Sequence, residues 1–332
     1  MTARSSFSRR ALLVAGAGTA LTLGLAPLAG RAGAADLTGV TLRAATYKAG
    51  DKLLLETSGL LNELPYKLEF AEFGSGNLIV EAINGGSIDI GSMSEIPPVF
   101  AAASGARIKV VAIARDDVNW QVVLVPKDSP IRSVADLKGK RVGYVRATTT
   151  HYYLAGMLRK VGLTFSDITP VALTPADGQA AFDRGALDAW AIYGYNVVFS
   201  VNAGARVLIT SNGYLSGNYA YSARAGALDD SRLTAAIGDY LDRLRRAYAW
   251  QGDNIDRWAE VHSAALGVTK DVDLQILRTS SQRRAIVPVT DEAVASSQAV
   301  ADTFAELGVI PARIEVAPLF DRRFNDLLSK AA

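Results

Sequence analysis

Three predicted helices begin directly after short segments of small polar residues, whose groups are suited to binding an anion. The segments are Gly74–Asn77, Gly91–Glu95 and Ala147–His151. The first turn of a helix carries free N–H groups and the positive end of the helix dipole, and Ser and Thr hydroxyls add donors without adding charge. Any one segment could serve only as an N-cap, because Ser, Thr and Asn are common N-cap residues. Three of them on loops that would meet at a cleft favour a ligand site.

Two sets of residues form this candidate ligand site. The polar segments supply Ser75, Gly76, Asn77, Ser94, Glu95, Thr148, Thr149, Thr150 and His151. Aromatic residues at the ends of other predicted strands could wall the apolar part of a ligand, although a buried aromatic residue is usually core; they are Tyr47, Trp120, Tyr193, Tyr195 and Tyr219. The ligand-binding residues that we predict from this second set and its neighbours are Tyr47, Lys48, Trp120, Tyr193, Asn196 and Tyr219.

Patterns for enzyme chemistry are absent from the sequence. Gly74–Asn77 lacks the third glycine of a dinucleotide-binding fingerprint, and the chain has neither a phosphate-loop motif nor a G-x-S-x-G elbow. It has no cysteine, which excludes disulfides, thiolate metal sites and cysteine nucleophiles, and it has only two histidines. We therefore expect no enzyme activity, no cofactor and no bound metal ion.

Residues 1–34 have the three-part layout of an export signal. Ser8–Leu13 contains a pair of arginines, the apolar run Ala11–Leu28 follows, and Ala32–Ala34 is a small-x-small cleavage sequence. Paired arginines are typical of the twin-arginine route, so we expect a periplasmic protein whose signal is cleaved near Ala34. A membrane anchor is the alternative, because the run is just long enough to span a bilayer. Its weak hydrophobicity and the cleavage sequence favour removal.

The charge of the chain changes when this segment is set aside. All 332 residues together carry 35 Lys and Arg against 33 Asp and Glu. Residues 1–34 hold four arginines and no acid, so the remainder has 31 basic residues against the same 33 acids and a formal charge of −2. Its three isolated arginine pairs, Arg245-Arg246, Arg283-Arg284 and Arg322-Arg323, are expected on solvated helix faces. We therefore expect no nucleic-acid partner.

Short apolar runs alternate with helix-like segments from residue 40 to about 210, which predicts βα units and mostly parallel sheets. The predicted strands are Val40–Ala45, Lys67–Ala71, Ile88–Gly91, Ile108–Ala114, Gln121–Pro126, Arg141–Val145, Ile168–Leu173, Ala189–Tyr193 and Arg206–Thr210. The predicted helices are Leu53–Leu64, Asn77–Asn84, Ile96–Ala103, His151–Val161 and Pro175–Arg184.

Helical periodicity takes over after residue 220. Leu233, Ile237, Leu241 and Leu244 stand at helical spacing. Further helices are predicted at 253–266, 270–278, 291–307 and Asn325–Lys330. We expect this tail to have no strands of its own and to pack on the first βα unit.

The βα pattern starts again with the predicted strand Arg141–Val145, which predicts two lobes. One is discontinuous, with residues 36–123 and 217–332, and the other, with residues 124–216, is inserted in it. Strand-like crossings near Trp120–Val125 and Asn218–Ser222 would form the hinge. Ligands of open α/β sheets bind at the carboxyl ends of the strands, so two such lobes would give a cleft that closes on a small molecule.

Several motifs resemble those of the aliphatic-sulfonate-binding proteins of ABC importers, within the nitrate/sulfonate/taurine binding family. The motifs are Phe73–Gly76, Ala82–Gly91, Glu95–Pro98, Val125–Pro130, Asp136–Lys140 and Ala181–Trp190. The resemblance implies a two-lobed periplasmic binding protein of type II, each lobe a mostly parallel sheet flanked by helices, with a helical C-terminal tail. It also implies a monomer that binds a small organic oxyanion and delivers it to an ABC permease in the inner membrane. The anion-binding loops of the family match Ser75–Asn77, Ser94–Glu95 and Thr148–His151.

The sequence departs from the family pattern at two places. Relatives often have a Gly-Ser start where this chain has Ala147-Thr148-Thr149, and they commonly read Trp-Asp-Pro-Tyr where this chain reads Tyr193–Asn196. The second change removes an acid expected to face the cleft, so we favour an alkyl or aryl sulfonate over taurine. Nitrate, taurine, a pyrimidine or an aromatic carboxylate are alternative ligands. A desulfinase-like enzyme of the same fold is a further alternative, and the absence of cysteine argues against it.

Overall fold

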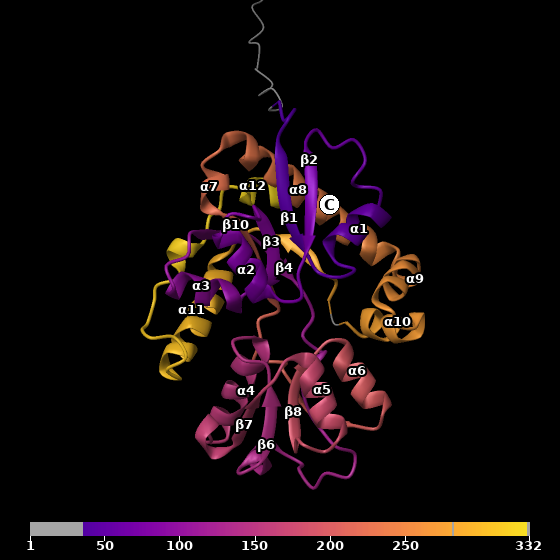
Figure 1. Ribbon diagram of the computed structural model, residues 1–332, viewed down its shortest axis with the longest axis vertical. Coiled ribbons are helices and arrows are strands. Elements are labelled where there is room, and N and C mark those ends of the chain that lie inside the picture. Colours follow the sequence, from indigo (N-terminus) through magenta and orange to yellow (C-terminus); the bar gives the residue numbers. More distant parts are fainter. Residues whose placement is uncertain (1–35, 281, 331–332) are drawn as a thin grey trace, which may run out of the picture. The chain divides into compact units, whose positions relative to one another are not determined.

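Two β-sheets, each flanked by helices, form the part of the chain that the computed structural model describes, residues 36–280 and 282–330 (Figure 1). The predicted export signal, residues 1–34, lies outside the described residues and stays a prediction. Among the described helices, none combines the length and the apolar character that crossing a membrane requires. We call the first sheet with its helices lobe I and the second sheet with its helices lobe II.

The sheet of lobe I has six strands in the order β11-β4-β10-β3-β1-β2. Their bounds are β1 Thr41–Thr46, β2 Lys67–Glu72, β3 Ile90–Ser94, β4 Ile108–Arg115, β10 Asn218–Arg224 and β11 Ala285–Val287. Strand β1 pairs in parallel with β2 and β3, and β10 lies antiparallel between β3 and β4. The sheet is therefore mixed rather than mostly parallel, because the chain returns from lobe II along β10.

The sheet of lobe II has five strands in the order β7-β6-β8-β5-β9. Their bounds are β5 Gln121–Val125, β6 Arg141–Tyr144, β7 Thr169–Ala172, β8 Ala189–Tyr193 and β9 Arg206–Thr210. Strand β6 pairs in parallel with β7 and β8, whereas β5 is antiparallel to both β8 and β9. This sheet is also mixed, because the entering strand β5 runs against its neighbours.

Helices cover these sheets and complete the chain. Lobe I contains α1 (Asp51–Thr57), α2 (Gly76–Asn84) and α3 (Ile96–Ala103), and lobe II contains α4 (Thr149–Lys160), α5 (Pro175–Asp183) and α6 (Tyr195–Asn202). The C-terminal helices are α7 (Ala225–Leu228), α8 (Ser231–Asp253), α9 (Ile255–Leu266), α10 (Lys270–Thr279), α11 (Asp291–Glu306) and α12 (Asn325–Leu328). Short 3-10 turns span Val134–Leu137, Phe165–Asp167 and Ala317–Leu319.

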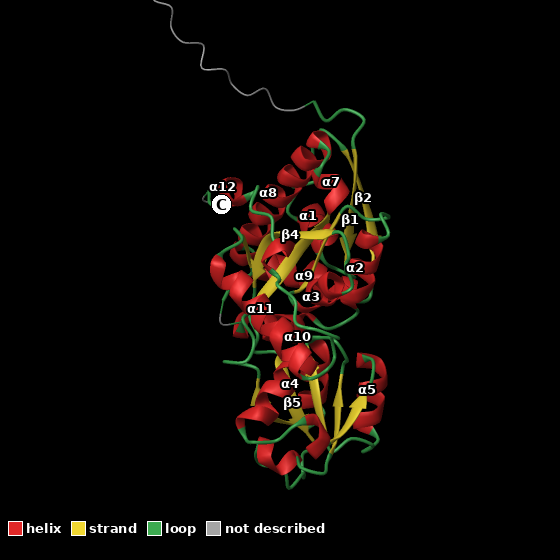
Figure 2. Cartoon of the chain, turned by 90° about the vertical axis from the view of Figure 1, so that its left-hand side faces the viewer, coloured by secondary structure: helices red, strands yellow, loops and turns green. Residues whose placement is uncertain are grey.

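The apolar run of β5 is buried on both faces of its sheet. Val122 and Leu124 pack in one core cluster with residues of α5 and α6, and Val123 and Val125 pack in another with residues of α4. Successive side chains of a strand point to opposite faces, so a strand covered on both sides is apolar throughout. Figure 2 shows helices on both sides of these strands.

Helix α8 attaches the C-terminal tail to lobe I. Its predicted apolar stripe is buried, with Ile237, Leu241 and Leu244 fully inside the core of lobe I beside residues of β1 and α1. Asp230 starts the helix by accepting the N–H groups of Arg232 and Leu233. Burying each large apolar side chain contributes about 1.5–3 kcal/mol. The predicted packing of the tail on the first βα unit is thus confirmed.

Three details differ from the sequence predictions. The tail does contribute a strand, β11, which pairs antiparallel with β4; three residues are too few for alternation to reveal it. Helix α1 ends at Thr57 rather than Leu64, because the chain turns at Gly59 with a φ of 75°. Helix α6 was not predicted, and Gly194 with a φ of 67° marks its start.

Two short segments, 116–120 and 211–217, connect the sheets. The residues predicted as hinge crossings, Trp120–Val125 and Asn218–Ser222, belong mostly to β5 and β10 instead, so the connections lie just before the predicted crossings. The segments run side by side, since the Asp116 N–H donates to the Gly217 carbonyl at 2.9 Å. The domain boundaries predicted from the sequence stay a prediction.

A close contact in lobe II makes Gly178 of α5 intolerant of a side chain. A Cβ atom there would lie 2.7 Å from Nε1 of Trp190, which is fully buried in the core. We expect Gly178→Ala to lower the free energy of unfolding by about 1–3 kcal/mol, because an overpacked core must shift. Urea denaturation of both proteins measures the difference.

Gly252→Ala is the matched control for this substitution. Gly252 is also helical, in α8, but its Cβ would meet only the side chain of the exposed Arg283. Alanine favours a helix over glycine by up to about 1 kcal/mol, so this variant should be no less stable than the parent. Equal stability of the two variants would contradict the role assigned to the Trp190 contact.

Candidate ligand-binding site

A cavity of about 490 Å³, the first cavity, is lined by residues of both lobes. Its volume is within the range of pockets that hold small organic ligands. The predicted site residues that line it are Tyr47, Ser75, Gly76, Asn77, Ser94, Trp120, Thr148, Thr149, Tyr193 and Tyr219. The structure thus brings together residues from all three polar segments and from the aromatic set. Their contact with a ligand stays a prediction.

Helices α2, α3, α4 and α6 start at the first cavity without a capping side chain. Ser75, Thr148 and Gly194, the N-cap residues of α2, α4 and α6, line it, as does Pro97 in the first turn of α3. None of these four helices has an N-cap side chain that accepts a first-turn N–H. Capping alone therefore does not account for Ser75 and Thr148, and the first-turn N–H groups are left to other partners.

Capped helices start elsewhere in the described part of the chain. The N-cap side chains of α5, α8, α10 and α11 accept first-turn N–H groups, and these N-cap residues are not among those that line the first cavity. At the start of α4, the Thr148 hydroxyl donates to the Val145 carbonyl at 2.8 Å instead of capping. Uncapped starts are not confined to the first cavity, since α7, α9 and α12 also lack a capping side chain and do not start there. The four capped starts, by contrast, all lie away from it.

Arg284 is a cavity residue that the sequence interpretation missed. It precedes β11 and lines the first cavity, so the expectation that this arginine pair lies on a solvated helix face is wrong for Arg284. Its guanidinium pairs with Asp116 at 3.0 Å and lies 5.0 Å from the ring centroids of Tyr219 and Tyr248. Its Nε has no hydrogen-bond partner among the described residues. A fixed positive charge therefore stands at the cavity, held by cation–π contacts and one ion pair.

The three aspartates that line the first cavity are engaged within the protein. Asp51 accepts hydrogen bonds from the Tyr221 and Tyr248 hydroxyls at 2.9 and 2.6 Å. Asp117 accepts a backbone N–H two residues further along the chain at 3.0 Å, and Asp116 pairs with Arg284. Asp116 thus has a cationic partner, whereas Asp51 and Asp117 are held by hydrogen bonds from neutral donors.

Aromatic rings wall the remainder of the first cavity. Tyr47, Tyr193 and Tyr219 are partly buried, and burial raises the pKa of each phenol above its usual value. They therefore stay protonated near neutral pH and can donate hydrogen bonds. The indole N–H of Trp120 donates to the hydroxyl of Thr279 in α10 at 3.2 Å, which fixes its ring.

Five predicted residues are not among those that line the first cavity: Lys48, Glu95, Thr150, His151 and Asn196. Lys48 is exposed and donates to the Leu266 carbonyl at 3.3 Å, and the Asn196 amide donates to Gln179 at 3.2 Å. The Thr150 hydroxyl accepts the Val145 N–H at 2.9 Å, which shapes the turn before α4.

Glu95 is buried without a cationic partner among the described ion pairs. Its carboxylate accepts hydrogen bonds from the hydroxyls of Ser216 at 2.6 Å and Ser296 at 2.8 Å. Burial raises the pKa of Glu95, while these hydroxyls act in the opposite direction. Glu95 thus ties α3 to the 211–217 connection and to α11.

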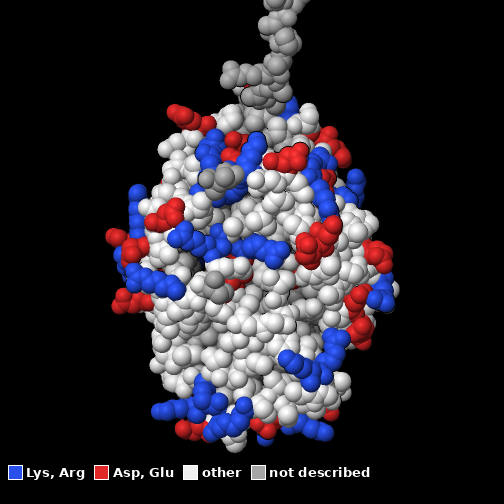
Figure 3. Space-filling model, turned by 180° about the vertical axis from the view of Figure 1, so that it is seen from behind, with Lys and Arg blue, Asp and Glu red and all other residues white. Residues whose placement is uncertain are grey.

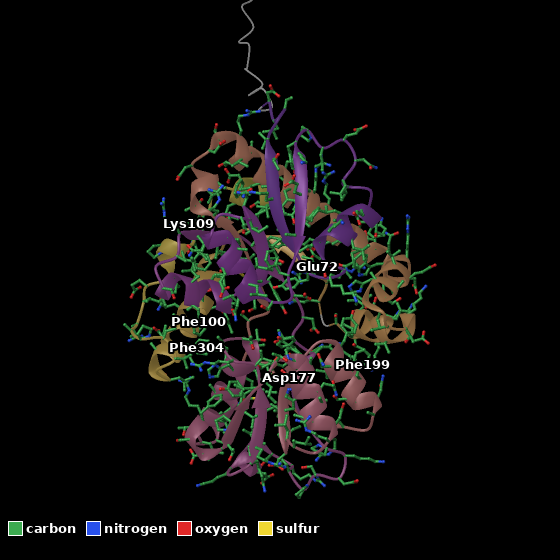
Figure 4. All side chains as sticks on the ribbon, viewed as in Figure 1. Glu72, Phe100, Lys109, Asp177, Phe199 and Phe304 are labelled. Atoms are coloured by element: carbon green, nitrogen blue, oxygen red, sulfur yellow. The ribbon has the colours of Figure 1, made fainter. Side chains whose placement is uncertain are left out.

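His151 lies inside an aromatic cluster between α4 and α11. Its ring centroid is 4.9 Å from Tyr144, 5.0 Å from Phe165 and 5.1 Å from Phe304. Figure 4 labels Phe304 beside Phe100, whose rings are 5.0 Å apart. The His151 Nδ1 accepts the Ala147 N–H at 3.3 Å, and burial, together with Arg146, lowers its pKa to about 4. The imidazole is therefore neutral near pH 7.

This lowered pKa predicts a pH dependence of stability. Between about pH 6.5 and pH 4 the unfolded chain binds a proton at His151 and the folded chain does not, so stability falls as the pH is lowered through this window. We expect His151→Gln to reduce the loss of unfolding free energy between pH 7 and pH 4.5 by about 2 kcal/mol. Urea denaturation at both pH values measures this, and an unchanged pH dependence would contradict the assignment.

Charges of both signs are mixed on the face of the protein that Figure 3 shows. Figure 3 shows Lys and Arg interspersed with Asp and Glu on the face turned away from Figure 1, with a broad area on the lower half that carries few charges. Nucleic-acid-binding proteins carry basic side chains gathered in one stripe or patch.

Two mixed sheets joined by two short segments, with a ligand-sized cavity at the ends of their strands, define the class of two-lobed solute-binding proteins. Comparisons with known proteins narrow this class. Residues 66–215 match the model of the NMT1/THI5-like family. A relative from Escherichia coli (strain K12), whose name places it among the aliphatic sulfonates-binding proteins, is 34% identical over 298 residues, which are 85% of this chain and 89% of the relative.

Two solved structures are similar over most of their length. The periplasmic aliphatic sulphonate binding protein SsuA from Escherichia coli has 32% identity and a TM-score of 0.76, covering 83% of this chain and 90% of that chain. The alkanesulfonate-binding protein SsuA from Xanthomonas axonopodis pv. citri has 31% identity and a TM-score of 0.77, covering 85% and 98%. This chain therefore belongs to the family of the aliphatic sulfonates-binding proteins, and it has the two-lobed periplasmic binding protein fold, as its motifs predicted.

Proposed function

We propose that this protein is a periplasmic solute-binding protein that captures a small organic sulfonate and passes it to an ABC permease of the inner membrane. The observation that carries the proposal is the first cavity, where four helices start without capping side chains beside Arg284 and a wall of aromatic rings. Membership of the family supports the same ligand class. A monomeric state stays a prediction.

The polar part of the first cavity fits a sulfonate headgroup. A sulfonate offers three acceptor oxygens and one delocalised negative charge, which suits first-turn N–H groups and neutral hydroxyls. Ser75, Ser94 and Thr149 supply hydroxyls at the starts of α2, α3 and α4, and Arg284 supplies a positive charge. The anion would be bound without proton transfer and without covalent chemistry.

The aromatic wall fits the organic part of the ligand. Trp120, Tyr193 and Tyr219 present large, weakly polar faces that can bury an alkyl or aryl group. We favour a sulfonate without an amino group, because the acid of the family motif is missing at Tyr193–Asn196 and the aspartates of the first cavity have partners within the protein. The solved relative from Xanthomonas axonopodis is bound to MOPS, a propanesulfonate that also carries a morpholine amine, so this relative supports the sulfonate headgroup and not the lack of an amino group.

Capture would proceed by closure of the two lobes. The connections 116–120 and 211–217 are short and adjacent, as expected of a hinge that absorbs the change in backbone angles. An enzyme of the desulfinase type is disfavoured, because its cysteine has no counterpart in a chain without cysteine. Nitrate, taurine, a pyrimidine or an aromatic carboxylate remain as competing ligands for the experiment to separate.

Removing one hydroxyl should weaken sulfonate binding. Thr149→Val keeps the shape of the side chain but removes a donor that lines the first cavity, so we expect the dissociation constant for butanesulfonate to rise about tenfold. Isothermal titration calorimetry with butanesulfonate, benzenesulfonate, taurine, nitrate and benzoate measures it and ranks the ligands.

Thr169→Val in β7 is the matched control, since Thr169 is exposed and lies outside the first cavity. It should leave every dissociation constant unchanged. Tighter binding of taurine, nitrate or benzoate than of both sulfonates would refute the proposed ligand class. Equal affinities of the parent and Thr149→Val would show that the start of α4 is not part of the site.

We further propose export by the twin-arginine route with cleavage near Ala34. Replacing both Arg9 and Arg10 by Lys should leave the protein in the cytoplasm, because this route reads the arginine pair. Arg4→Lys, outside the pair, is the control and should be exported normally. Fractionation of the producing cells gives the ratio of periplasmic to cytoplasmic protein. N-terminal sequencing of the periplasmic form gives the cleavage site. Normal export of the double variant would exclude the route.

A further inference from the structure

A second cavity, of about 560 Å³, adjoins the first cavity on the side of α8, α9 and α10. The two cavities have lining residues in common, namely Gly50, Asp116, Tyr248, Ile276, Ser280 and Arg284. The Arg284 guanidinium stands between Tyr219, which lines only the first cavity, and Tyr248, which lines both. The second cavity therefore extends the candidate site away from the helix starts and hydroxyls that line the first cavity.

The inner wall of the second cavity is aromatic and aliphatic. Beyond the junction its apolar lining consists of Leu54, Tyr195, Ile255, Trp258 and Leu277. Trp258 is buried and stacks on His262, with ring centroids 4.6 Å apart and planes 23° apart. These side chains come from lobe I and, through Tyr195, from α6 of lobe II.

Hydrogen bonds fix this wall in place. The Tyr195 hydroxyl donates to Asp273 at 2.7 Å, and Asp273, which is fully buried, also bonds the Nδ1 of His262 at 2.9 Å. A side chain fixed in this way loses little further freedom when a ligand packs on it, which favours binding. The wall is thus pre-arranged rather than a loose gap between helices.

Two of the arginines that line the second cavity, Arg278 and Arg283, are exposed and do not belong to its inner wall. Arg278 pairs with Asp256 and Arg283 with Asp253, each at 2.7 Å. Arg284 lines both cavities, and the proposed function assigns its charge to the sulfonate headgroup in the first cavity. The inner wall, formed by Leu54, Tyr195, Ile255, Trp258 and Leu277, therefore fits an apolar group.

We infer that the second cavity holds the apolar tail of an elongated sulfonate whose headgroup lies in the first cavity. The inference rests on the proposed function and names the substrate class more closely: long-chain alkyl sulfonates or sulfonates with an extended aryl group. It assigns Ile276 and Leu277 of α10 and Trp258 of α9 to ligand selection.

A chain-length series tests the inference. Each methylene group that leaves water for an apolar wall should increase the affinity about fourfold, so the parent protein should bind octanesulfonate far more tightly than ethanesulfonate. Isothermal titration calorimetry with ethane-, butane-, hexane- and octanesulfonate gives the change in binding free energy per methylene group. A flat series would overturn the inference.

Gly252→Leu is designed to fill the second cavity and leave the first unchanged. Gly252 lines only the second cavity, and its Cβ would lie 2.8 Å from Cδ of Arg283, an exposed side chain that can swing away. We expect this variant to bind octanesulfonate at least tenfold more weakly and ethanesulfonate within twofold of the parent. Gly252→Ala, which adds one methyl group at the same place, is the control and should keep most of the chain-length slope.

Leu277→Trp narrows the same cavity from α10 and guards against a folding defect of the first variant. Circular dichroism and thermal denaturation confirm the fold of each variant. Equal weakening of ethane- and octanesulfonate, or unchanged octanesulfonate affinity in both folded variants, would overturn the inference while leaving sulfonate binding intact. Failure of the parent to bind any sulfonate would overturn the proposed function itself, and the inference with it.

Discussion

The first turn of every α-helix leaves N–H groups without a partner in the helix, and this constraint organises the candidate site. A buried N–H without a partner is costly, so helices are normally capped by a side chain or by solvent. Helices α5, α8, α10 and α11 have such a side-chain cap, and α7, α9 and α12 lack one away from the first cavity. Helices α2, α3, α4 and α6 lack one and start together at the first cavity. The fold thereby concentrates hydrogen-bond donors at one place. The strand order of both sheets, the two connections and the burial of α8 all serve to bring these helix starts together.

The donors are neutral, and this agrees with the modest charge of the chain. Apart from residues 1–34 the acids slightly outnumber the bases, and on the visible face of Figure 3 both signs are mixed. Arg284 adds one positive charge, held between the rings of Tyr219 and Tyr248 and balanced by Asp116. An anion site of this kind depends on direction and burial more than on net charge, because electrostatic interactions strengthen where water is excluded.

Much of the site could be predicted from the sequence because its signals are local. A polar segment that joins a strand to a helix fixes both the place and the kind of donor, as at Ser75 and Thr149. Arg284 could not be found in this way, since its ion-pair partner lies 168 residues away in the chain. Glu95 was assigned to the ligand for the same reason: the hydroxyls that bind it come from positions 121 and 201 residues further along. Strand β11 was not predicted because three residues show no periodicity. Its pairing with β4 is what makes these residues a strand.

Contacts that join the lobes outside the first cavity have a consequence for release as well as capture. Tyr195 of α6 bonds Asp273 of α10 on one side, and Arg159 of α4 pairs with Glu306 of α11 at 3.0 Å on the other. In a protein that interconverts between open and closed arrangements, such contacts change the populations of the two, and the apparent dissociation constant scales inversely with the fraction that is competent to bind. Tyr195 also lines the second cavity, whereas Arg159 and Glu306 line neither cavity. Residence time can therefore be adjusted at the contact between α4 and α11 while the cavity residues stay the same. Which ligand is chosen and how long it is kept are two separately tunable properties of this fold.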